Sequence, residues 1–365
     1  YVADNASTDN SVTFLKTTFP SIKIIQNKEN GGYAKGYNDA LKQVDADVFC
    51  LLNSDVEVTK NWLIPIIDTF KVEENTAIIQ PKLLDHNKKD YFEYAGAAGG
   101  FIDKYGYPYC RGRIFNTIEK DNGQYNDTTE IFWASGACLF IRSNVFKTLN
   151  GLDEAFFAHM EEIDLCWRAK NVGCKIKYVG KSTVYHVGGA TLSNVNPKKT
   201  FLNFRNSLFT LTKNAKGNLF IIILTRLLLD GIAGIKFLFD LKPNHTFAIV
   251  KAHFSFYNNL SRLLKYRNSS SPKLNYYQHK SIVFDAITNP RNCGLEPETL
   301  IELEKALSEL KLDVESQLGT SFAYGIEKLA NLTNNINDYN NSISIIMLTI
   351  ERNISKSVNY SKHRK

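Results

Sequence analysis

The chain has 365 residues, of which 44% are hydrophobic and 22% charged, with a formal net charge of +7. This length allows one large domain or two ordinary ones, and the composition is that of a soluble globular protein. The six cysteines form no CxxC pair, which argues against a zinc knuckle or a disulfide framework and favours reduced thiols in a cytosolic protein.

The first part of the chain alternates strand-like and helix-like stretches. Short apolar runs predict strands at 22–26, 48–52 and 77–80, and helical spacing predicts helices at 33–44 and 62–70. This alternation indicates an α/β fold with a doubly wound parallel sheet. Because ligands of such sheets bind at the carboxyl ends of the strands, polar residues that follow the apolar runs are candidate site residues.

The middle of the chain is less regular. Residues 93–126 are rich in Gly and Tyr and predict loops with short strands, and 131–142 reads as a strand. A helix is expected at 160–172, followed by strands at 176–179 and 183–187. We place the end of a catalytic domain, residues 1–209, soon after these strands.

Residues 210–267 form a basic, apolar region. The run at 218–241 is long enough for a membrane span, but Arg226, Asp230 and Lys236 interrupt it, and each costs several kcal/mol at a bilayer centre. From residue 195 to 280 there are 14 Lys or Arg and two Asp. This pattern favours amphipathic helices on an anionic membrane surface over nucleic-acid binding. A helical cap on the sheet domain is the alternative.

The C-terminal part divides into a linker and a tail. Residues 268–284 are a polar linker, and 285–365 are expected to form a helical accessory or oligomerisation tail, because 297–312 has helical periodicity. This tail contains no candidate site.

Two polar motifs follow expected strands near the N-terminus. Asp4 lies in the sequence DNASTD, where Ser7 or Asp9 is also typical of a helix N-cap; in the functional interpretation Asp4 accepts hydrogen bonds from a nucleobase. Asn53 and Asp55 directly follow the run VFCLL. A carboxylate there can hold a divalent cation together with diphosphate oxygens, or be only a turn residue.

Two further motifs lie later in the chain. Glu161, Glu162 and Asp164 fall in the first turn of an expected helix, where acidic residues complement the helix dipole. Three carboxylates exceed that need, and their repulsion raises at least one pKa, which suits a general base. His186 ends an expected strand before two glycines and is either a structural histidine or a metal ligand.

The order and spacing of these segments resemble family 2 glycosyltransferases, in particular their bacterial rhamnosyltransferase-like branch. The segments are DNASTD, ENGGYAKGYN, LLNSDVEV, EEIDLCWR and YHVGG, over about residues 1–265. The resemblance implies a GT-A, Rossmann-like fold with a mostly parallel sheet and flanking helices, followed by a helical C-terminal region. It also implies a metal-dependent inverting hexosyltransferase that moves a sugar from a UDP-, dTDP- or GDP-sugar to an acceptor hydroxyl.

The resemblance also assigns roles to residues. Glu162 is the expected base, with Glu161 beside it, and Asp164 orients the acceptor or Arg168. Asp55 and His186 are expected to bind Mg²⁺ or Mn²⁺. The nucleotide-binding candidates are Asp4, Asn5, Ser7, Gly32, Asn38 and Asn53.

The same resemblance suggests a glycan or lipid-linked acceptor in bacterial cell-surface polysaccharide synthesis. The expected location is cytoplasmic, peripheral at the inner face of the cell membrane, with no nucleic-acid partner.

The sequence departs from the family pattern at its start. It begins inside the second expected strand, so roughly 35 residues of a first βα unit are expected to be absent, with a cost in stability and activity. Two other functions remain open: a sugar nucleotidyltransferase, whose Gly-rich phosphate loop is not found, and a non-catalytic sugar-nucleotide or membrane-surface binding protein.

Overall fold

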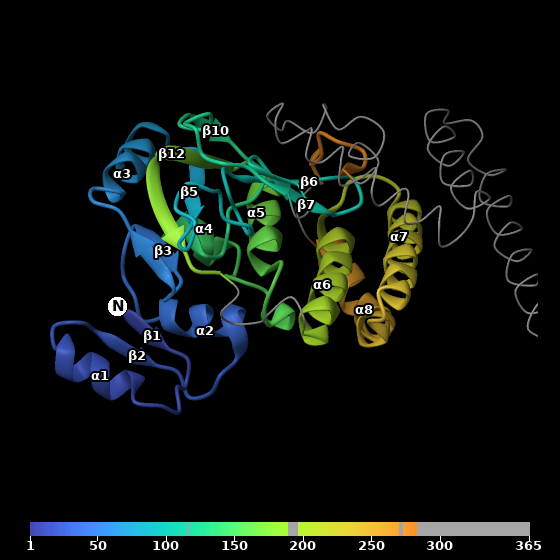
Figure 1. Ribbon diagram of the computed structural model, residues 1–365, viewed down its shortest axis with the longest axis horizontal. Helices are drawn as coiled ribbons and strands as arrows, with labels where there is room; N and C mark the ends of the chain where they lie inside the picture. Colours follow the sequence, from blue (N-terminus) through green and yellow to red (C-terminus); the bar gives the residue numbers. More distant parts are fainter. Residues whose placement is uncertain (115–116, 189–195, 270–272, 283–365) are drawn as a thin grey trace, which may run out of the picture. The chain divides into compact units, whose positions relative to one another are not determined.

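The computed structural model describes residues 1–114, 117–188, 196–269 and 273–282, and residues 1–282 form one compact unit (Figure 1). The predicted tail, 285–365, lies outside the described residues, and the domain boundaries at 209 and 267 stay predictions. Residue 209 falls inside a helix.

The element bounds are as follows. The helices are α1 (Ser11–Thr18), α2 (Gly32–Leu41), α3 (Leu63–Val72), α4 (Ser143–Thr148), the 3₁₀ helix η1 (Glu154–Phe156), α5 (Glu161–Asn171), α6 (Pro197–Asn214), α7 (Leu219–Phe239) and α8 (Pro243–Ser269). The strands are β1 (Val2–Asp4), β2 (Ile24–Gln26), β3 (Val48–Leu52), β4 (Val56–Val58), β5 (Thr76–Asp85), β6 (Gly100–Ile102), β7 (Pro108–Cys110), β8 (Arg113–Ile114), β9 (Thr117–Ile118), β10 (Thr128–Glu130), β11 (Cys138–Arg142) and β12 (Lys175–His186).

The central sheet confirms the α/β class but not a mostly parallel sheet. Its order is β10-β12-β5-β11-β3, and β4 also pairs with β12. Only the β12–β5 pairing is parallel among the described strands of this sheet. Strands β3, β5 and β12 do run in one direction, as expected, but β11 is inserted antiparallel between β3 and β5. The sheet is therefore mixed.

Strand β5 lies in the middle of the sheet and is buried along nearly its whole length. A strand covered on both faces reads as a continuous apolar run, which explains why the sequence at 77–80 was recognisable. The predicted strands at 176–179 and 183–187 are one strand, β12, with a register irregularity between Val179 and Thr183. His186 ends this strand, so the sheet core directly supports its backbone.

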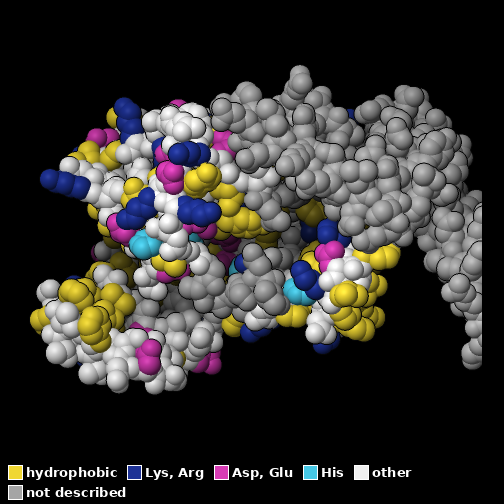
Figure 2. Space-filling model, in the orientation of Figure 1, with side chains coloured by type: hydrophobic (Ala, Val, Ile, Leu, Met, Phe, Trp, Pro, Cys, Tyr) yellow, Lys and Arg dark blue, Asp and Glu magenta, His cyan; other side chains and the backbone are white. Residues whose placement is uncertain are grey.

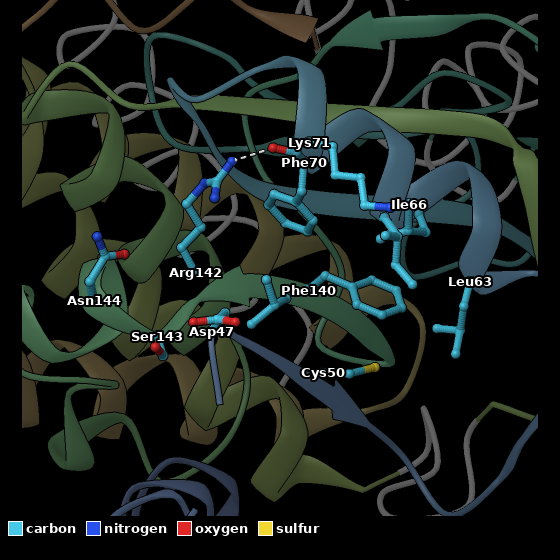
Figure 3. Close-up of a pocket in the computed structure, with 12 residues that line it drawn as sticks. Asp47, Cys50, Leu63, Ile66, Phe70, Lys71, Phe140, Arg142, Ser143 and Asn144 are labelled. Carbon is cyan, nitrogen blue, oxygen red and sulfur yellow. Dashed lines mark hydrogen bonds between the residues drawn. The ribbon is translucent and has the colours of Figure 1, made fainter. Parts of the chain in front are cut away.

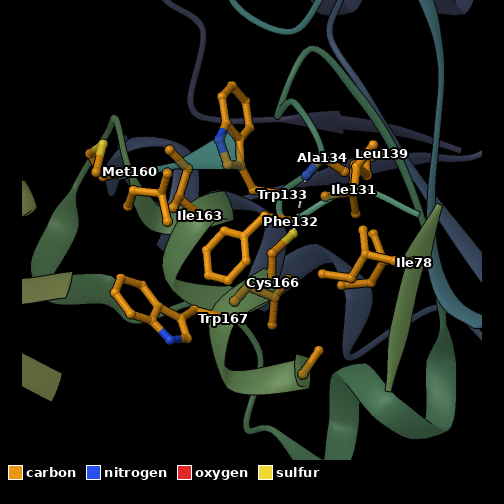
Figure 4. Packing of buried hydrophobic residues seen from close by; sticks show 14 of the residues in the cluster. Ile78, Ile131, Phe132, Trp133, Ala134, Leu139, Met160, Ile163, Cys166 and Trp167 are labelled. Carbon is orange, nitrogen blue, oxygen red and sulfur yellow. Dashed lines mark hydrogen bonds between the residues drawn. The ribbon is translucent and has the colours of Figure 1, made fainter. Parts of the chain in front are cut away.

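Helix α5 is anchored in the core by aromatic packing. Trp167 is almost fully buried, and its ring meets that of Phe132 edge to face, with centroids 5.3 Å apart. Ile163 and Cys166 lie in the same cluster (Figure 4). Burial of these side chains stabilises the helix by roughly 1.5–3 kcal/mol for each large one. The first turn of α5, with its acidic residues, is thereby held at a fixed position.

The N-terminal strands form a separate parallel pair. β1 and β2 pair from Val2↔Ile24 to Asp4↔Gln26, and within the described residues neither strand pairs with β3. Strand β3 is therefore an edge strand of the central sheet in this part of the chain. The predicted cost of an absent first βα unit stays a prediction.

The Gly- and Tyr-rich stretch and the C-terminal region also have the expected character. The former contains a four-stranded antiparallel sheet of short strands, β6-β7-β8-β9. The latter contains α6, α7 and α8. Asn196 and Asn218 are the N-caps that precede α6 and α7, and the side chain of each accepts a backbone N–H. Among the described helices, none combines the length and the apolar character required to cross a membrane.

Candidate active site

The loop after β1 is occupied by local contacts. The carboxylate of Asp4 accepts the backbone N–H of Ser7, at 3.2 Å to the nearer oxygen. The predicted N-cap interpretation of Ser7 or Asp9 is wrong, because the N-cap of α1 is Asn10. The amide of Asn5 donates to the carbonyl oxygen of Gly32 at 3.1 Å and thereby joins this loop to the start of α2. Asp4, Asn5, Ser7 and Gly32 thus lie close together, and their role in nucleotide binding stays a prediction.

Gly32 is required by its backbone and by its neighbour. Its φ is +79°, and a Cβ atom built there would lie 2.5 Å from the carbonyl oxygen of Phe157. The same oxygen accepts the backbone N–H of Tyr33 at 2.8 Å. A side chain at position 32 would therefore push α2 away from the loop that precedes α5.

Asn38 has a different position from that expected of a nucleotide ligand. It is buried, donates to the carbonyl oxygen of Leu152 at 2.8 Å and accepts the backbone N–H of Leu152 at 2.9 Å. Its amide also donates to Glu154 at 3.1 Å. Through these contacts Asn38 holds the loop at 152–154. The structure thus gives Asn38 a structural role in place of the nucleotide-binding role predicted from the sequence.

The start of β4 lies beside the end of β12, because Val56 pairs with His186. Asp55 Oδ1 is 3.3 Å from His186 Nε2, which brings the two predicted metal ligands into direct contact. On the other side of the ring, His186 Nδ1 is 3.3 Å from Glu93 Oε1. Burial alone lowers the pKa of His186, but the neighbouring carboxylates of Glu93 and Asp55 outweigh it and raise the pKa above 6.5.

These donors fit a divalent cation only in part. In the described ranges no group of three His, Cys, Asp or Glu side chains is arranged to hold a metal. The Asp55 carboxylate is partly exposed, and with His186 it offers two ligands. Hard cations in nucleotide sites complete their coordination with phosphate oxygens and water, so two protein ligands suffice for a cation that arrives with a diphosphate. Asn53 lies two residues before Asp55, and its backbone N–H donates to the carbonyl oxygen of Ala137 at 3.0 Å.

Glu93 was not predicted from the sequence. It lies in the Gly- and Tyr-rich stretch, does not follow an apolar run and is buried against His186. Its Oε2 atom accepts the backbone N–H of Ala95 at 2.6 Å, which fixes the carboxylate. A carboxylate beside the second nitrogen of a histidine favours one orientation of the ring, so Glu93 belongs to the same cluster as Asp55 and His186.

The acid pair Glu161 and Glu162, at the start of α5, has no cationic partner in the described part of the chain, unlike Asp55 beside His186. Glu161 is buried and Glu162 is partly exposed, and the Oε2 atom of each is buried without a hydrogen-bond partner among the described residues. Burial raises the pKa of Glu162 to about 7. Burial and the charge of Glu162 raise the pKa of Glu161 well above its ordinary value. A carboxylate that titrates near neutral pH can exchange a proton with a substrate hydroxyl.

Asp164 is not available to a substrate. It is 0% exposed and bound by Arg168 at 2.8 Å and by Lys213 at 2.9 Å, and it also accepts from Asn214. Although burial alone raises the pKa of Asp164, Lys213 and Arg168 hold it below its usual value. Its predicted contact with Arg168 is confirmed, but a catalytic role on the acceptor is wrong for this buried ion.

The loop that leads into α5 has an unusual backbone. Phe157, His159 and Met160 have φ of 65°, 69° and 72°, in the left-handed region that such side chains rarely adopt. Three carbonyl oxygens of this segment lie 2.7–3.1 Å from the side-chain nitrogen of Asn206 on α6. Arg205 adds bonds to the carbonyl oxygens of residues 155 and 156. Such strained backbone persists where the surroundings hold it, and here α6 does so.

Helix α2 links the two halves of the site. The Tyr37 hydroxyl donates to the carbonyl oxygen of Leu52 at the end of β3, at 3.0 Å. The ring centroid of Tyr33 lies 4.7 Å from that of Tyr37. Burial, with the charges of Tyr37, Glu161 and Glu162, raises the pKa of Tyr33. Helix α2 therefore contacts the end of β3 through Tyr37 and lies near the acid pair through Tyr33.

A hollow of about 750 Å³ lies elsewhere, between α3 and the edge strand β3. Figure 3 shows Leu63, Ile66 and Phe70 on one side and Cys50 on the other, with Arg142 donating to the carbonyl oxygen of Phe70. None of the predicted site residues lines it. We therefore do not assign the donor to this hollow.

The N-terminal part of the chain matches a known protein family. Residues 1–149 match the model of the family described as Glycosyl transferase family 2. The chain carries a family 2 glycosyltransferase domain. The N-acetylglucosaminyl-diphospho-decaprenol L-rhamnosyltransferase of Mycobacterium tuberculosis is 24% identical to it over 200 residues, which cover 51% of this chain and 65% of that protein.

Two further relatives of the glycosyltransferase domain are similarly distant. The low-salt glycan biosynthesis hexosyltransferase Agl10 of Haloferax volcanii is 26% identical over 180 residues, 48% of this chain and 54% of that protein. The rhamnosyltransferase WbbL of Escherichia coli is 24% identical over 158 residues, 41% of this chain and 59% of that protein. The chain thus spans less than two thirds of the length of these relatives.

Likeness to solved structures is weak. GalNAc-T7 with UDP, GalNAc and Mn²⁺ is 14% identical, with a TM-score of 0.45 over 59% of this chain and 42% of that one. S. aureus TarS 1–349 in complex with UDP is 15% identical, with a TM-score of 0.40 over 75% of this chain and 83% of that one. Neither likeness bears on the ligands of this glycosyltransferase domain.

Proposed function

We propose that this chain transfers a hexose, as rhamnosyltransferases do, from a nucleoside diphosphate sugar to an acceptor hydroxyl, with inversion at the anomeric carbon. The observation that carries the proposal is the environment of Glu162. The side chain is partly exposed, one of its carboxylate oxygens is buried without a described partner, and its pKa is about 7. A base of this kind is poised to accept a proton at neutral pH.

In this reaction Glu162 removes the proton of the acceptor hydroxyl. The acceptor oxygen attacks the anomeric carbon from the face opposite the diphosphate, so the bond to the diphosphate breaks as the new glycosidic bond forms. Burial and the charge of Glu162 raise the pKa of Glu161 well above its ordinary value, which favours the protonated form of Glu161 and disfavours a second negative charge beside the base.

The donor is proposed to lie between β1 and the end of β3. Asp4, Asn5 and Gly32 surround its base, and Asp55 and His186 would hold Mn²⁺ or Mg²⁺ at the diphosphate. Such a cation neutralises charge on the departing diphosphate. Glu93 orients the His186 ring so that Nε2 points toward Asp55.

The acceptor is proposed to be a glycan or a lipid-linked sugar in cell-surface polysaccharide synthesis. One relative is named for a decaprenol-linked diphosphate acceptor. Residues 195–280 carry 14 Lys or Arg and two Asp, a charge balance that suits an anionic membrane. We place the protein in the cytoplasm, peripheral to the inner face of the cell membrane.

The proposal is tested with Glu162→Gln, which keeps the size of the side chain and removes the base. Turnover of dTDP-, UDP- and GDP-sugars is followed by release of the nucleoside diphosphate in the presence of acceptor. We expect a loss of kcat of about 100-fold or more, the usual contribution of a general base, with donor binding retained. Glu74→Gln, an exposed carboxamide substitution on the loop after α3, is the matched control.

Unchanged turnover in Glu162→Gln would overturn the assignment of the base. Donor binding without turnover in the unmodified protein, across all three donors and with lipid-linked acceptors, would favour a sugar-nucleotide binding protein instead.

A further inference from the structure

Helix α7 has its polar side inward and its apolar side outward. Arg226 and Asp230 are buried and form an ion pair of 2.7 Å. Leu228, Ile232 and Ile235, by contrast, are 50%, 52% and 48% exposed. Spacings of four and three residues place these three on one face of the helix. A helix whose outer face meets only water has the opposite arrangement.

The buried polar groups fix this orientation. The guanidinium of Arg226 also donates to the carbonyl oxygen of Tyr105 at 3.0 Å, and Asp230 lies 3.2 Å from His253 of α8. Rotation of α7 to hide its apolar face would break these contacts and leave two buried charges without partners, which is costly. The outward apolar face is therefore a stable property of the fold.

Helix α8 extends the same type of surface. Phe247 and Phe254 are 63% and 67% exposed and are seven residues apart, so they share a face. Figure 2 shows hydrophobic side chains gathered over α7 and α8 where described atoms form the surface. We call these exposed apolar residues of the two helices the α7–α8 face.

Charge distinguishes between possible partners of this face. Of the two acidic residues in 195–280, Asp230 is buried and Asp240 pairs with Lys236 at 2.9 Å. Lys242, Lys251 and Lys265 are exposed on the same helices or beside them. A second copy of the chain would bring two cationic surfaces together, whereas an anionic bilayer attracts the lysines and takes up the apolar side chains.

We propose that the α7–α8 face is a docking surface for an anionic lipid bilayer, with both helices in the plane of the headgroups. The buried Arg226–Asp230 pair belongs on the protein side of this surface, and the leucine, isoleucine and phenylalanine side chains enter the interface. The inference rests on the proposed function only in one respect: a lipid-linked acceptor would reach the protein at this membrane surface. Its test needs neither donor nor turnover.

The test is co-sedimentation of the full chain with phosphatidylcholine vesicles, with and without about one third phosphatidylglycerol. We expect binding to the anionic vesicles, a decrease with added salt and weak binding to phosphatidylcholine alone. Leu228→Glu/Ile232→Glu is expected to weaken vesicle binding about tenfold or more, because it removes two apolar contacts and adds negative charge.

The matched control is Val72→Glu, because Val72 is 80% exposed on α3 and lies away from this face. It should leave vesicle binding unchanged. Equal binding by the double variant and the unmodified chain would overturn the proposal. A second result would also overturn the proposal: the unmodified chain does not bind vesicles and is a dimer by light scattering, whereas the double variant is a monomer. Loss of vesicle binding in the double variant, with normal turnover on a soluble acceptor, supports the docking surface. Vesicle binding by the unmodified chain without any turnover rejects only the proposed function.

Discussion

The side-chain nitrogen of Asn206 lies 2.7 Å from the carbonyl oxygen of His159, two residues before Glu161. This contact joins α6 to the loop that carries the acid pair. The same nitrogen also reaches the carbonyl oxygens of Phe156 and Ala158. A side chain in the helical region, almost fifty residues further along the chain, thus sets the backbone from which the proposed base projects.

Asn206→Ala should therefore reduce catalysis more than it reduces donor binding. Without the amide, the left-handed backbone at His159 and Met160 relaxes and the first turn of α5 shifts. Because displacement of a catalytic group by about 1 Å can cost 100-fold in rate, we expect kcat to fall about 10- to 100-fold with little change in donor KM. Asn259→Ala, which removes a similar amide-to-carbonyl bond within α8, is the control. Equal effects of the two substitutions would contradict a specific role of Asn206.

The pKa of Glu162 predicts opposite effects of pH on activity and on stability. The pKa is about 7 in the folded protein and near 4.5 in the unfolded chain. The stability that the protonated carboxyl contributes is complete below pH 4.5 and is lost as pH rises through 7. Activity, which needs the ionised base, rises over the upper part of the same range. Glu162→Gln removes this titrating group and with it the pH dependence of stability. At pH 8 the variant should therefore be more stable than the unmodified protein by on the order of 1–3 kcal/mol.

The measurement is urea unfolding of both proteins at pH 5 and pH 8, with kcat followed from pH 5 to 9. A profile of kcat that is flat through pH 7, or a variant that is less stable than the unmodified protein at pH 8, would contradict this assignment.

The metal-side residues are tested by nucleotide-dependent thermal stabilisation. A nucleoside diphosphate with Mn²⁺ at about 100 times its Kd adds about 2.7 kcal/mol of stability. We expect the shift in Tm to be lost in Asp55→Ala and reduced in Glu93→Gln, because the latter no longer orients the His186 ring. Asp68→Ala, at an exposed carboxylate of α3, should retain the shift. A full, metal-dependent shift in Asp55→Ala would remove this residue from the site.

The buried ion group around Asp164 should be structural. Lys213→Met leaves Asp164 without one of its two cations, and breaking a buried pair of this type costs about 3–5 kcal/mol. Lys42→Met, which removes an exposed pair with Asp39, should change stability little. Urea unfolding measures both. If the two variants were equally stable, the buried pair would not be the link between α5 and α6 that its distances indicate.

The features predicted correctly from the sequence are those with a local signal. Strand β3 was predicted at its observed bounds because an apolar run ends there in polar residues, and the start of α5 because acidic residues precede an amphipathic stretch. The contact of Asp55 with His186 was predicted from the family resemblance, which assigned both residues to one metal site. The direction of β11 was not predictable, because an apolar run specifies a strand but not its orientation.

The missed residues have no local signal. Glu93 follows no apolar run, and Asn206 lies within a helix among polar neighbours that resemble a solvated face. Both acquire their roles only when distant elements meet, Glu93 against the end of β12 and Asn206 against the loop before α5. Asn38 and Asp164 show the converse, since their sequence positions suggested ligands but their side chains are used in internal contacts.

The position of α6 determines how short a functional fragment can be. The family match ends at residue 149, yet Arg205, Asn206 and Lys213 hold the backbone and ions behind the acid pair. A gene trimmed at the family boundary would omit the acid pair itself, and one trimmed before residue 214 would keep the pair but cut the helix that fixes it. The smallest expression unit with an ordered active site therefore extends through the whole of α6.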